Sequence, residues 1–152
     1  MVAVRPQGAR TIDEILASAR ARLTRLMPRE AFGDQGAGGV LIDIRPAAQR
    51  AAQGEIPGSI IIERNHLEWR LDPCSDARLP WVTGYDHRII VCCEDGYTSS
   101  LAAAALQDLG LHRATDVIGG FRVWAAEGLP SAPAAAGTVT LAPGASPALV
   151  PG

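Results

Sequence analysis

A cysteine at the end of an apolar run is the residue of this chain best placed to do chemistry. Residues Ile89–Cys92 are typical of a buried strand, and an alanine-rich, helix-forming run begins at about Ser99. Cys93 lies between the two segments, in a short loop that contains Gly96. Unpaired backbone N–H groups and the positive end of the helix dipole would face its thiol, and both favour the thiolate. The spacing therefore predicts a nucleophile together with an anion-binding loop.

The two adjacent cysteines are expected to have different roles, because successive side chains of a strand point to opposite faces. Cys92 continues the apolar run and is predicted to pack in the core as a small hydrophobic residue, whereas Cys93 opens the loop. A disulfide between them would place a strained ring in the strand, so we expect two free thiols. The third cysteine, Cys74, lies in a polar, proline-containing stretch and is predicted to occupy an exposed turn.

The composition limits the classes of function to consider. A chain of 152 residues can form one domain with a core, and a net charge of −2 gives no basic surface for nucleic acid. No apolar run approaches the ~20 residues of a membrane span, and the N-terminal residues lack the apolar core of a signal peptide. An odd number of cysteines suits a reducing cytoplasm. We therefore predict a cytoplasmic protein without nucleic-acid or membrane partners.

Neither a metal site nor a cofactor is predicted. The three histidines, His66, His87 and His112, are scattered, and no spacing of cysteine and histidine resembles a metal site. The glycine-rich segment from Gly33 to Gly39 lacks the spacing of a phosphate-binding loop, so it is interpreted as a plain connector.

Residues 1–37 are predicted to form an N-terminal helix and a connector that pack on the domain. Thr11 and Glu14 have the spacing of a capping box, and apolar residues recur at helical intervals up to Met27. Pro28 is expected to end this helix, which would cover residues 12–27.

Strand-like and helix-like segments alternate through the middle of the chain. Strands are predicted at 40–44, 60–62, 89–92 and 116–118, with helices at 46–53, 65–71, 99–109 and from 121 onward. This alternation predicts an α/β fold with a largely parallel sheet, in which functional sites form at the carboxyl ends of the strands. Asp43 and Cys93 each lie at such an end.

The last residues, 131–152, differ in character from the rest. They carry no charge and consist mostly of alanine, proline and glycine, so they cannot bury enough apolar surface to offset the entropy of ordering. We predict a disordered or loosely attached tail, in which 138–141 is the one piece that could add a strand.

Four segments, in order, resemble the rhodaneses, a family of sulfurtransferases. Residues 41–45 resemble the family's Asp-x-Arg strand end, and 54–59 resemble its Gly-x-Ile-Pro-Gly-Ser turn. Residues 93–98 resemble its six-residue active loop, and Gly119-Gly120 with Trp124 resembles its closing element. The resemblance covers about residues 38–130. The N-terminal helix and residues 63–71 also resemble the single-domain rhodaneses of actinobacteria.

The resemblance implies a rhodanese-like α/β fold with a small parallel sheet flanked by helices on both faces. It also implies that the Cys93 thiolate takes a sulfur atom from a small donor such as thiosulfate, becomes a persulfide and passes the sulfur to cyanide or a thiol. The substrate-binding loop would consist of Glu94, Asp95, Gly96, Tyr97 and Thr98, with backbone N–H groups around the anionic sulfur. Asp43 and Arg45 would support it, Arg45 as a partner of a carboxylate or of backbone carbonyls.

The acidic pair in the loop departs from the family pattern. Many members carry arginine directly after the cysteine and at the sixth loop position, where this chain has Glu94 and Thr98, and Asp95 adds a second carboxylate. Two carboxylates at an exposed rim would repel a dianionic donor, and each repulsion should cost only about 1 kcal/mol after screening. The pair could select a neutral or cationic donor or a basic partner protein, or it could simply point into solvent.

Three other functions compete with this interpretation. A cysteine phosphatase needs a loop one residue longer that ends in arginine, but Ser99 holds that position and the next arginine is Arg113. A non-catalytic docking module would fit an acidic loop, although it would not need Cys93. A persulfide relay would use Cys74 as its second thiol.

Overall fold

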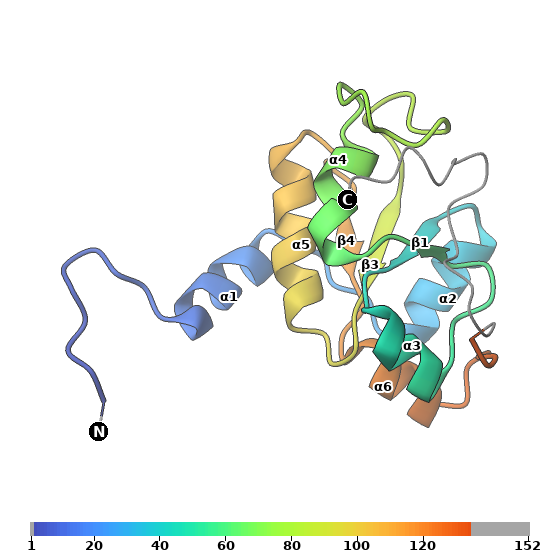
Figure 1. The fold of residues 1–152 in the computed structure, drawn as a ribbon, viewed down its shortest axis with the longest axis horizontal. Helices are drawn as coiled ribbons and strands as arrows, with labels where there is room; N and C mark the ends of the chain where they lie inside the picture. Colours follow the sequence, from blue (N-terminus) through green and yellow to red (C-terminus); the bar gives the residue numbers. More distant parts are fainter. Residues whose placement is uncertain (1, 135–152) are drawn as a thin grey trace.

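The computed structural model describes residues 2–134, and in that part of the chain four strands form a parallel sheet in the order β2-β1-β3-β4 (Figure 1). The strands are β1 (Val40–Asp43), β2 (Ile60–Ile61), β3 (Ile89–Cys92) and β4 (Thr115–Asp116). The helices are α1 (Ile12–Ala21), α2 (Pro28–Gly36), α3 (Ala47–Gln53), η1 (Arg64–His66), α4 (Leu67–Leu71), α5 (Thr98–Asp108) and α6 (Gly120–Ala126). The predicted α/β fold is confirmed.

Helices cover both faces of the sheet, and each face has its own core. On one face, Ile42 and Val91 pack with Leu67 of α4 and Leu106 of α5. On the other face, a second apolar cluster joins the sheet to α2 and α6; its members include Leu41, Ile90, Ala31, Phe121 and Trp124. Because neighbouring residues of β1 and β3 contribute to opposite cores, β3 is apolar along its whole length and β1 is apolar up to Asp43, as expected for buried parallel strands.

The strand register brings the chemically important ends together. Val40 pairs with Ile89 and Asp43 pairs with Cys92, so β1 and β3 end at the same level. Val91 pairs with Asp116, which places the end of β4 beside them. The residues that follow these strands therefore emerge at one edge of the sheet, as expected for a site at the carboxyl ends of parallel strands.

The predicted helix over residues 12–27 is wrong over its last six residues, 22–27. Helix α1 ends at Ala21, and Pro28 begins helix α2, which also replaces most of the predicted glycine-rich connector. The residues between the helices run along β4: the Leu26 N–H donates to the Asp116 carbonyl at 3.0 Å, and the Ile118 N–H donates to the Leu26 carbonyl at 2.8 Å. These long-range bonds satisfy backbone groups that a continued helix would have paired locally, and proline is favoured in a first helical turn.

The helix ends also differ in detail from the expectation. The Glu14 N–H donates to the Thr11 hydroxyl at 3.1 Å, but the Glu14 carboxylate pairs with Arg5, so only half of the predicted capping box forms. The helix predicted over residues 65–71 begins only at Leu67, because Asn65 lies inside the 3₁₀ turn η1 that leads directly into α4. Helix α5 ends at Asp108, one residue before the predicted end, and Gly110 beyond it adopts a φ of +102°, a conformation common after helix ends.

The two ends of the described chain leave the sheet in different ways. Helix α1 contacts α5, and the residues before it project away from the body (Figure 1). At the other end, Glu55 and Ala132 exchange backbone hydrogen bonds of 2.7 and 2.8 Å, which attach the start of the predicted tail to the domain. Residues 135–152 of that tail, including the predicted strand at 138–141, lie outside the described residues. Within residues 2–134, no helix combines the length and apolar character needed to cross a membrane.

Candidate active site

Cys93 lies in the turn between β3 and α5, with its thiol directed at backbone N–H groups. The N–H groups of Gly96 and Ser99 donate to Sγ at 3.2 and 3.4 Å. The Ser99 N–H belongs to the first turn of α5, where amides have no partner within the helix. The sequence-based loop stopped at Thr98, so it missed Ser99, although this general property of helix starts could have identified it. The arrangement can stabilise negative charge on sulfur.

Gly96 permits the tight turn of this loop. Its φ is +81°, and a Cβ placed on it would come within 2.7 Å of the Gly119 backbone nitrogen. A side chain at this position would therefore push the loop away from the Gly119-Gly120 turn. Gly120 has a similar constraint, since its Cβ would lie 2.3 Å from the Cys93 carbonyl oxygen. The predicted closing element thus packs directly against the cysteine loop, which explains why both segments need glycine.

Cys92 is fully buried in the core on the opposite face of the sheet from Cys93. This separation confirms the predicted alternation of the two side chains. Burial, together with the charges of Asp43 and Cys93, raises the pKa of the Cys92 thiol well above its usual value. Cys92 therefore stays protonated near neutral pH and is out of reach of a dissolved reagent.

Asp43 and Arg45 form a buried ion pair at the end of β1. Arg45 Nε donates to Asp43 Oδ1 at 3.0 Å, and Nη2 donates to Oδ2 at 2.7 Å and to the Gly54 carbonyl at 2.8 Å. The guanidinium also lies over the Phe121 ring, 4.0 Å from its centre. Burial by itself lowers the pKa of Arg45, but its hydrogen bonds to Asp43 and the charge of that carboxylate outweigh burial and raise the pKa. Arg45 has the two kinds of partner that we predicted.

Glu94 does not lie at an exposed rim, contrary to the expectation. Its side chain is only 10% exposed, and Oε1 accepts a hydrogen bond from Arg45 Nη1 at 3.4 Å. Its Oε2 atom is buried and has no hydrogen-bond partner among the described residues. The cause is the register of β1 and β3, which brings the residues after both strands to the same place.

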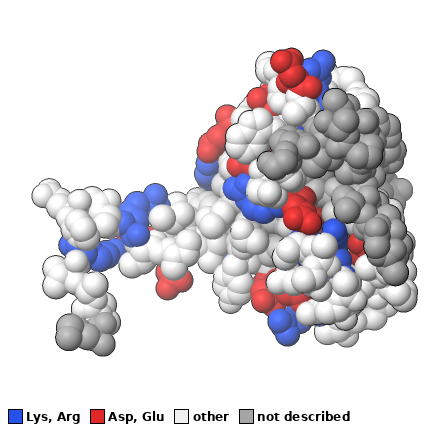
Figure 2. Space-filling view, in the orientation of Figure 1, with Lys and Arg blue, Asp and Glu red and all other residues white. Residues whose placement is uncertain are grey.

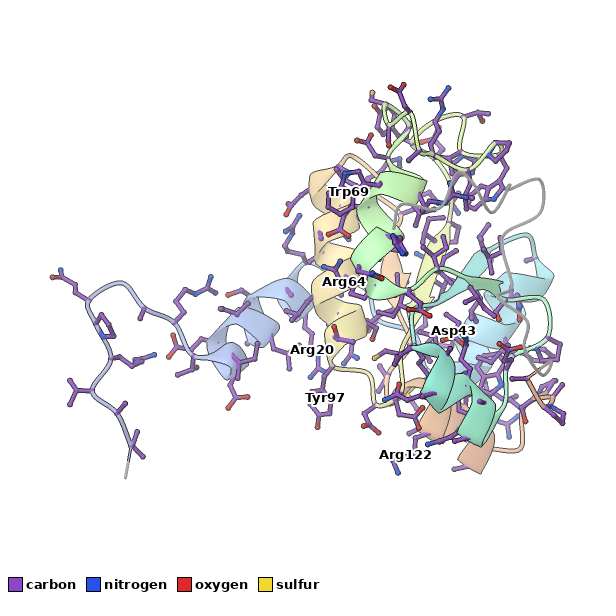
Figure 3. The ribbon with its side chains drawn as sticks, viewed as in Figure 1. Arg20, Asp43, Arg64, Trp69, Tyr97 and Arg122 are labelled. Atoms are coloured by element: carbon purple, nitrogen blue, oxygen red, sulfur yellow. The ribbon has the colours of Figure 1, made fainter. Side chains whose placement is uncertain are left out.

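Asp95 is exposed but is also paired. Its side chain is 45% exposed, and Oδ1 accepts a hydrogen bond from Arg122 Nε of α6 at 2.6 Å. That hydrogen bond and the Asp95 charge raise the pKa of Arg122. Figure 3 places Arg122 on the far side of the loop from Arg20 and Tyr97. Each carboxylate of the acidic pair therefore faces an arginine from another element, and acidic and basic groups lie side by side on the face in Figure 2.

A pocket of about 290 Å³ opens directly over Cys93. It is lined by the end of β1, the start of α3 and the cysteine loop: Ile44, Arg45, Pro46, Gln49, Cys93, Glu94, Asp95, Tyr97 and Thr98. All the predicted site residues except Asp43 and Gly96 border this space, and these two contact Arg45 and the Cys93 thiol. The volume suits a small molecule rather than a large ligand.

A second layer of polar groups lies behind the loop, and the sequence did not indicate it. Asp116 is fully buried at the end of β4, where Oδ2 accepts hydrogen bonds from the Ser99 and Ser100 hydroxyls at 2.8 Å each. Arg25 Nε donates to Asp116 Oδ1 at 2.8 Å. These contacts join residues far apart in the chain, so no local pattern could reveal them.

Cys74 is far from Cys93, which removes the basis for a direct relay between the two thiols in one chain. Cys74 Sγ lies 3.2 Å from the Tyr85 hydroxyl, and the Tyr85 ring lies against Gly110, just beyond the end of α5. Cys93 lies instead at the start of α5, whose 11 residues span roughly 16 Å at 1.5 Å per residue. Among residues 2–134, no group of three His, Cys, Asp or Glu side chains could hold a metal ion.

Comparison with known proteins agrees with the α/β fold described above. The model of the rhodanese-like domain family matches residues 28–127, from α2 to the residue after α6. The chain is 34% identical over 100 residues to the thiosulfate sulfurtransferase GlpE of Stutzerimonas stutzeri. The matched residues make up 66% of this chain and 83% of that protein. It is 33% identical over 91 residues to a sulfurtransferase of Allochromatium vinosum, covering 60% of this chain and 76% of that one.

Among solved structures, a protein of unknown function from Rhodopseudomonas palustris, named as a possible tyrosine phosphatase, is similar to this chain. The two are 31% identical with a TM-score of 0.75, and the match covers 86% of this chain and 100% of that one. The polysulfide-sulfur transferase of Wolinella succinogenes shares the fold at 23% identity and a TM-score of 0.62, over 81% of this chain and 88% of that one.

Proposed function

Because this chain belongs to the rhodanese-like domain family and is similar to sulfurtransferases, we propose that Cys93 carries a sulfur atom from a donor such as thiosulfate to a thiophilic acceptor. The observation that carries the proposal is the Cys93 thiol at the base of a small pocket, hydrogen-bonded by the N–H groups of Gly96 and Ser99. The resemblance to actinobacterial members stays a prediction, as does a cytoplasmic location.

In the first half-reaction, the Cys93 thiolate attacks the outer sulfur of thiosulfate. A new S–S bond forms on the cysteine, the bond between the two donor sulfurs breaks, and sulfite leaves with the electron pair. In the second half-reaction, cyanide or a thiolate attacks the terminal sulfur of the persulfide, and the Cys93 thiolate leaves. The Cys93 thiolate is the nucleophile of the first half-reaction and the leaving group of the second. The amides 3.2 and 3.4 Å from Sγ stabilise its negative charge and therefore favour both steps.

The paired carboxylates favour a donor of low charge without excluding thiosulfate. Arg45 lies between Asp43 and Glu94, so this buried group of three carries one net negative charge beside the pocket. Asp95 and Arg122 neutralise each other at the surface. A basic protein partner at the acidic loop would have to compete with Arg122 for Asp95, and Glu94 is too buried to take part. The structure thus favours small substrates over the docking alternative.

Phosphatase chemistry is a poorer fit to the same loop. A phosphoryl group needs an arginine that makes two parallel hydrogen bonds to its oxygens, and none occurs between Cys93 and Ser99. Arg20 and Arg25 are near the loop, but both donate to the Gly96 carbonyl, and neither lines the pocket over Cys93. Assay of the protein with p-nitrophenyl phosphate should therefore show no cysteine-dependent hydrolysis.

Mass spectrometry after incubation with thiosulfate tests the proposed function. The peptide containing Cys93 should gain one sulfur atom, and addition of cyanide should remove it as thiocyanate. Cys93→Ser should abolish the gain and leave the far-ultraviolet circular dichroism unchanged, whereas Cys74→Ser should behave like the unmodified protein. The proposal is overturned if the Cys93 peptide gains no sulfur atom after incubation with thiosulfate, with polysulfide or with mercaptopyruvate.

A further inference from the structure

We propose that Arg20 and Arg25, which precede the family's domain in the chain, are positioning residues for the cysteine loop and supply the positive charge that its own side chains lack. This inference rests on the proposed function in its use of Cys93 as the nucleophile. Arg20 Nη2 and Arg25 Nη2 donate to the same atom, the Gly96 carbonyl oxygen, at 2.7 and 3.0 Å. Figure 3 shows Arg20 beside Tyr97 at the start of α5, and its guanidinium lies 5.4 Å from the centre of the Tyr97 ring.

The shared carbonyl connects both arginines to the cysteine loop at Gly96, the residue whose own N–H donates to the thiol. The Gly96 carbonyl and the Tyr97 N–H belong to the same peptide, and the described residues contain no cis bond, so the two groups point in opposite directions. Hydrogen bonds from two cations hold the carbonyl in place and polarise the peptide, which makes the Tyr97 N–H a stronger donor. The neighbouring peptide carries the Gly96 N–H that donates to Cys93 Sγ.

Asp116 extends this arrangement to the second amide at the thiol. Arg25 donates to both Asp116 oxygens, at 2.8 and 3.1 Å. The same carboxylate accepts the Ser99 hydroxyl, and the Ser99 N–H donates to Cys93 Sγ. The Arg20–Arg25–Asp116 cluster therefore contacts both residues whose amides hold the thiol. Loss of either arginine would therefore remove a positive charge and also loosen an amide that donates to the thiol.

The charge of the cluster has the sign that the loop requires. Two arginines and one carboxylate leave one net positive charge behind the loop, whose own residues 94–98 include no arginine or lysine. The Arg25 side chain is only 15% exposed, so water screens its charge less than that of a surface arginine. On the pocket side, the facing groups are Arg45 with Asp43 and Glu94, and Asp95 with Arg122. The cluster thus opposes the net negative charge of the buried group in front.

Alkylation of Cys93 provides a test that does not require sulfur transfer. In a Cys74→Ser background, the rate of iodoacetamide alkylation is measured between pH 5 and 10 for Arg20→Ala, Arg25→Ala and Arg22→Ala. Arg22 is the matched control, since it lies in the same segment and pairs with Asp108 of α5 instead of the loop. We expect a rate about three- to tenfold lower at pH 7 for Arg20→Ala and Arg25→Ala, with the profile displaced to higher pH. Arg22→Ala should match the background.

Conservative variants separate charge and positioning from general stability. Arg25→Ala leaves Asp116 buried without its cation and can unfold the protein, so Arg25→Lys and Arg20→Lys are measured in parallel with thermal melts. Lysine should restore most of the pH 7 alkylation rate even where the melting temperature stays low. The proposal is overturned if the profiles of the folded Arg20 and Arg25 variants coincide with that of Arg22→Ala. A displaced profile in a protein that accepts no sulfur would instead uphold the cluster and refute the proposed function.

Discussion

Arg45 Nη1 and Glu94 Oε1 lie 3.4 Å apart, although the two residues are 49 positions apart in the chain. One follows β1 and the other follows β3, so the contact is a direct product of the strand register. The contact places the Glu94 carboxylate beside the cysteine loop and at the same time removes it from the solvent. The charge beside the pocket therefore depends on the pairing of Arg45 with Glu94, which cannot be inferred from the sequence around either residue alone.

Glu94→Gln should lower the KM for thiosulfate about three- to tenfold at low salt, because it removes one negative charge beside an incoming dianion. The effect should shrink as ionic strength rises, and kcat should change less, since the amides at Sγ are untouched. Steady-state kinetics with cyanide as acceptor measure both constants. Asp108→Asn removes one charge at the far end of α5 and should leave the KM unchanged. Equal kinetics for Glu94→Gln and the native protein at low salt would show that this carboxylate has no influence on donor binding.

Arg122→Ala should have the opposite effect, a KM for thiosulfate about two- to fivefold higher at low salt, since it leaves the exposed Asp95 charge unpaired at the pocket rim. The double variant Arg122→Ala with Asp95→Asn should return close to the native KM. Arg29→Ala is a suitable control, because its ion pair with Glu127 lies outside the pocket lining. If the double variant stays as weak as Arg122→Ala, the arginine acts through its packing and not through its charge.

Gly96→Ala should abolish sulfur transfer, and we expect a loss of about 1–3 kcal/mol in the free energy of unfolding from the backbone strain at positive φ. The added Cβ would meet the Gly119 nitrogen, so the loop must move and its amides leave the thiol. Urea unfolding and thiocyanate formation measure the two effects. Gly84→Ala is the matched control, since Gly84 has no positive φ and its Cβ would meet nothing within 4 Å. Full activity in Gly96→Ala would contradict the role of this turn.

Cys92→Ala should keep most of the activity and lower the free energy of unfolding by about 1 kcal/mol at pH 7. The raised pKa of Cys92 adds a dependence on pH. In the unfolded chain the thiol ionises at a pH of about 8.5, whereas in the folded protein it stays protonated to higher pH. Above that pH the folded state binds more protons than the unfolded state, so stability falls as pH rises, by at most about 1.4 kcal/mol per unit.

Urea unfolding of the native protein and Cys92→Ala between pH 7 and 10 tests this linkage. The advantage of the native protein should be complete at pH 7 and disappear at alkaline pH. The chain contains 14 arginines and no lysine, so lysine titration does not complicate this range. A difference between the two proteins that stays constant up to pH 10 would show that Cys92 ionises as readily in the core as in water.

Local patterns in the sequence were sufficient for the α/β class and for the opposite orientations of the adjacent cysteines. An apolar run followed by a cysteine, a glycine and a helix-forming segment specifies strand, loop and helix by itself, because side-chain alternation and helix starts are properties of a few consecutive residues. The same reasoning placed Asp43 and Cys93 at neighbouring strand ends, since parallel strands share one carboxyl edge. Only the motif resemblance, taken over four segments, carried the inference to sulfur chemistry.

The tertiary structure decided where the charges lie and where the N-terminal helix stops. Residues 22–27 have helical periodicity, but hydrogen bonds between Leu26 and the Asp116–Ile118 segment draw them along β4. Glu94 is polar and follows a strand, yet Arg45 and the register of the sheet bury it. Arg25 meets Asp116 across 91 positions in the chain. Each of these results depends on contacts between segments that are distant in the chain, and these contacts stabilise the fold. Such contacts produce no periodicity or characteristic spacing in the sequence around either residue.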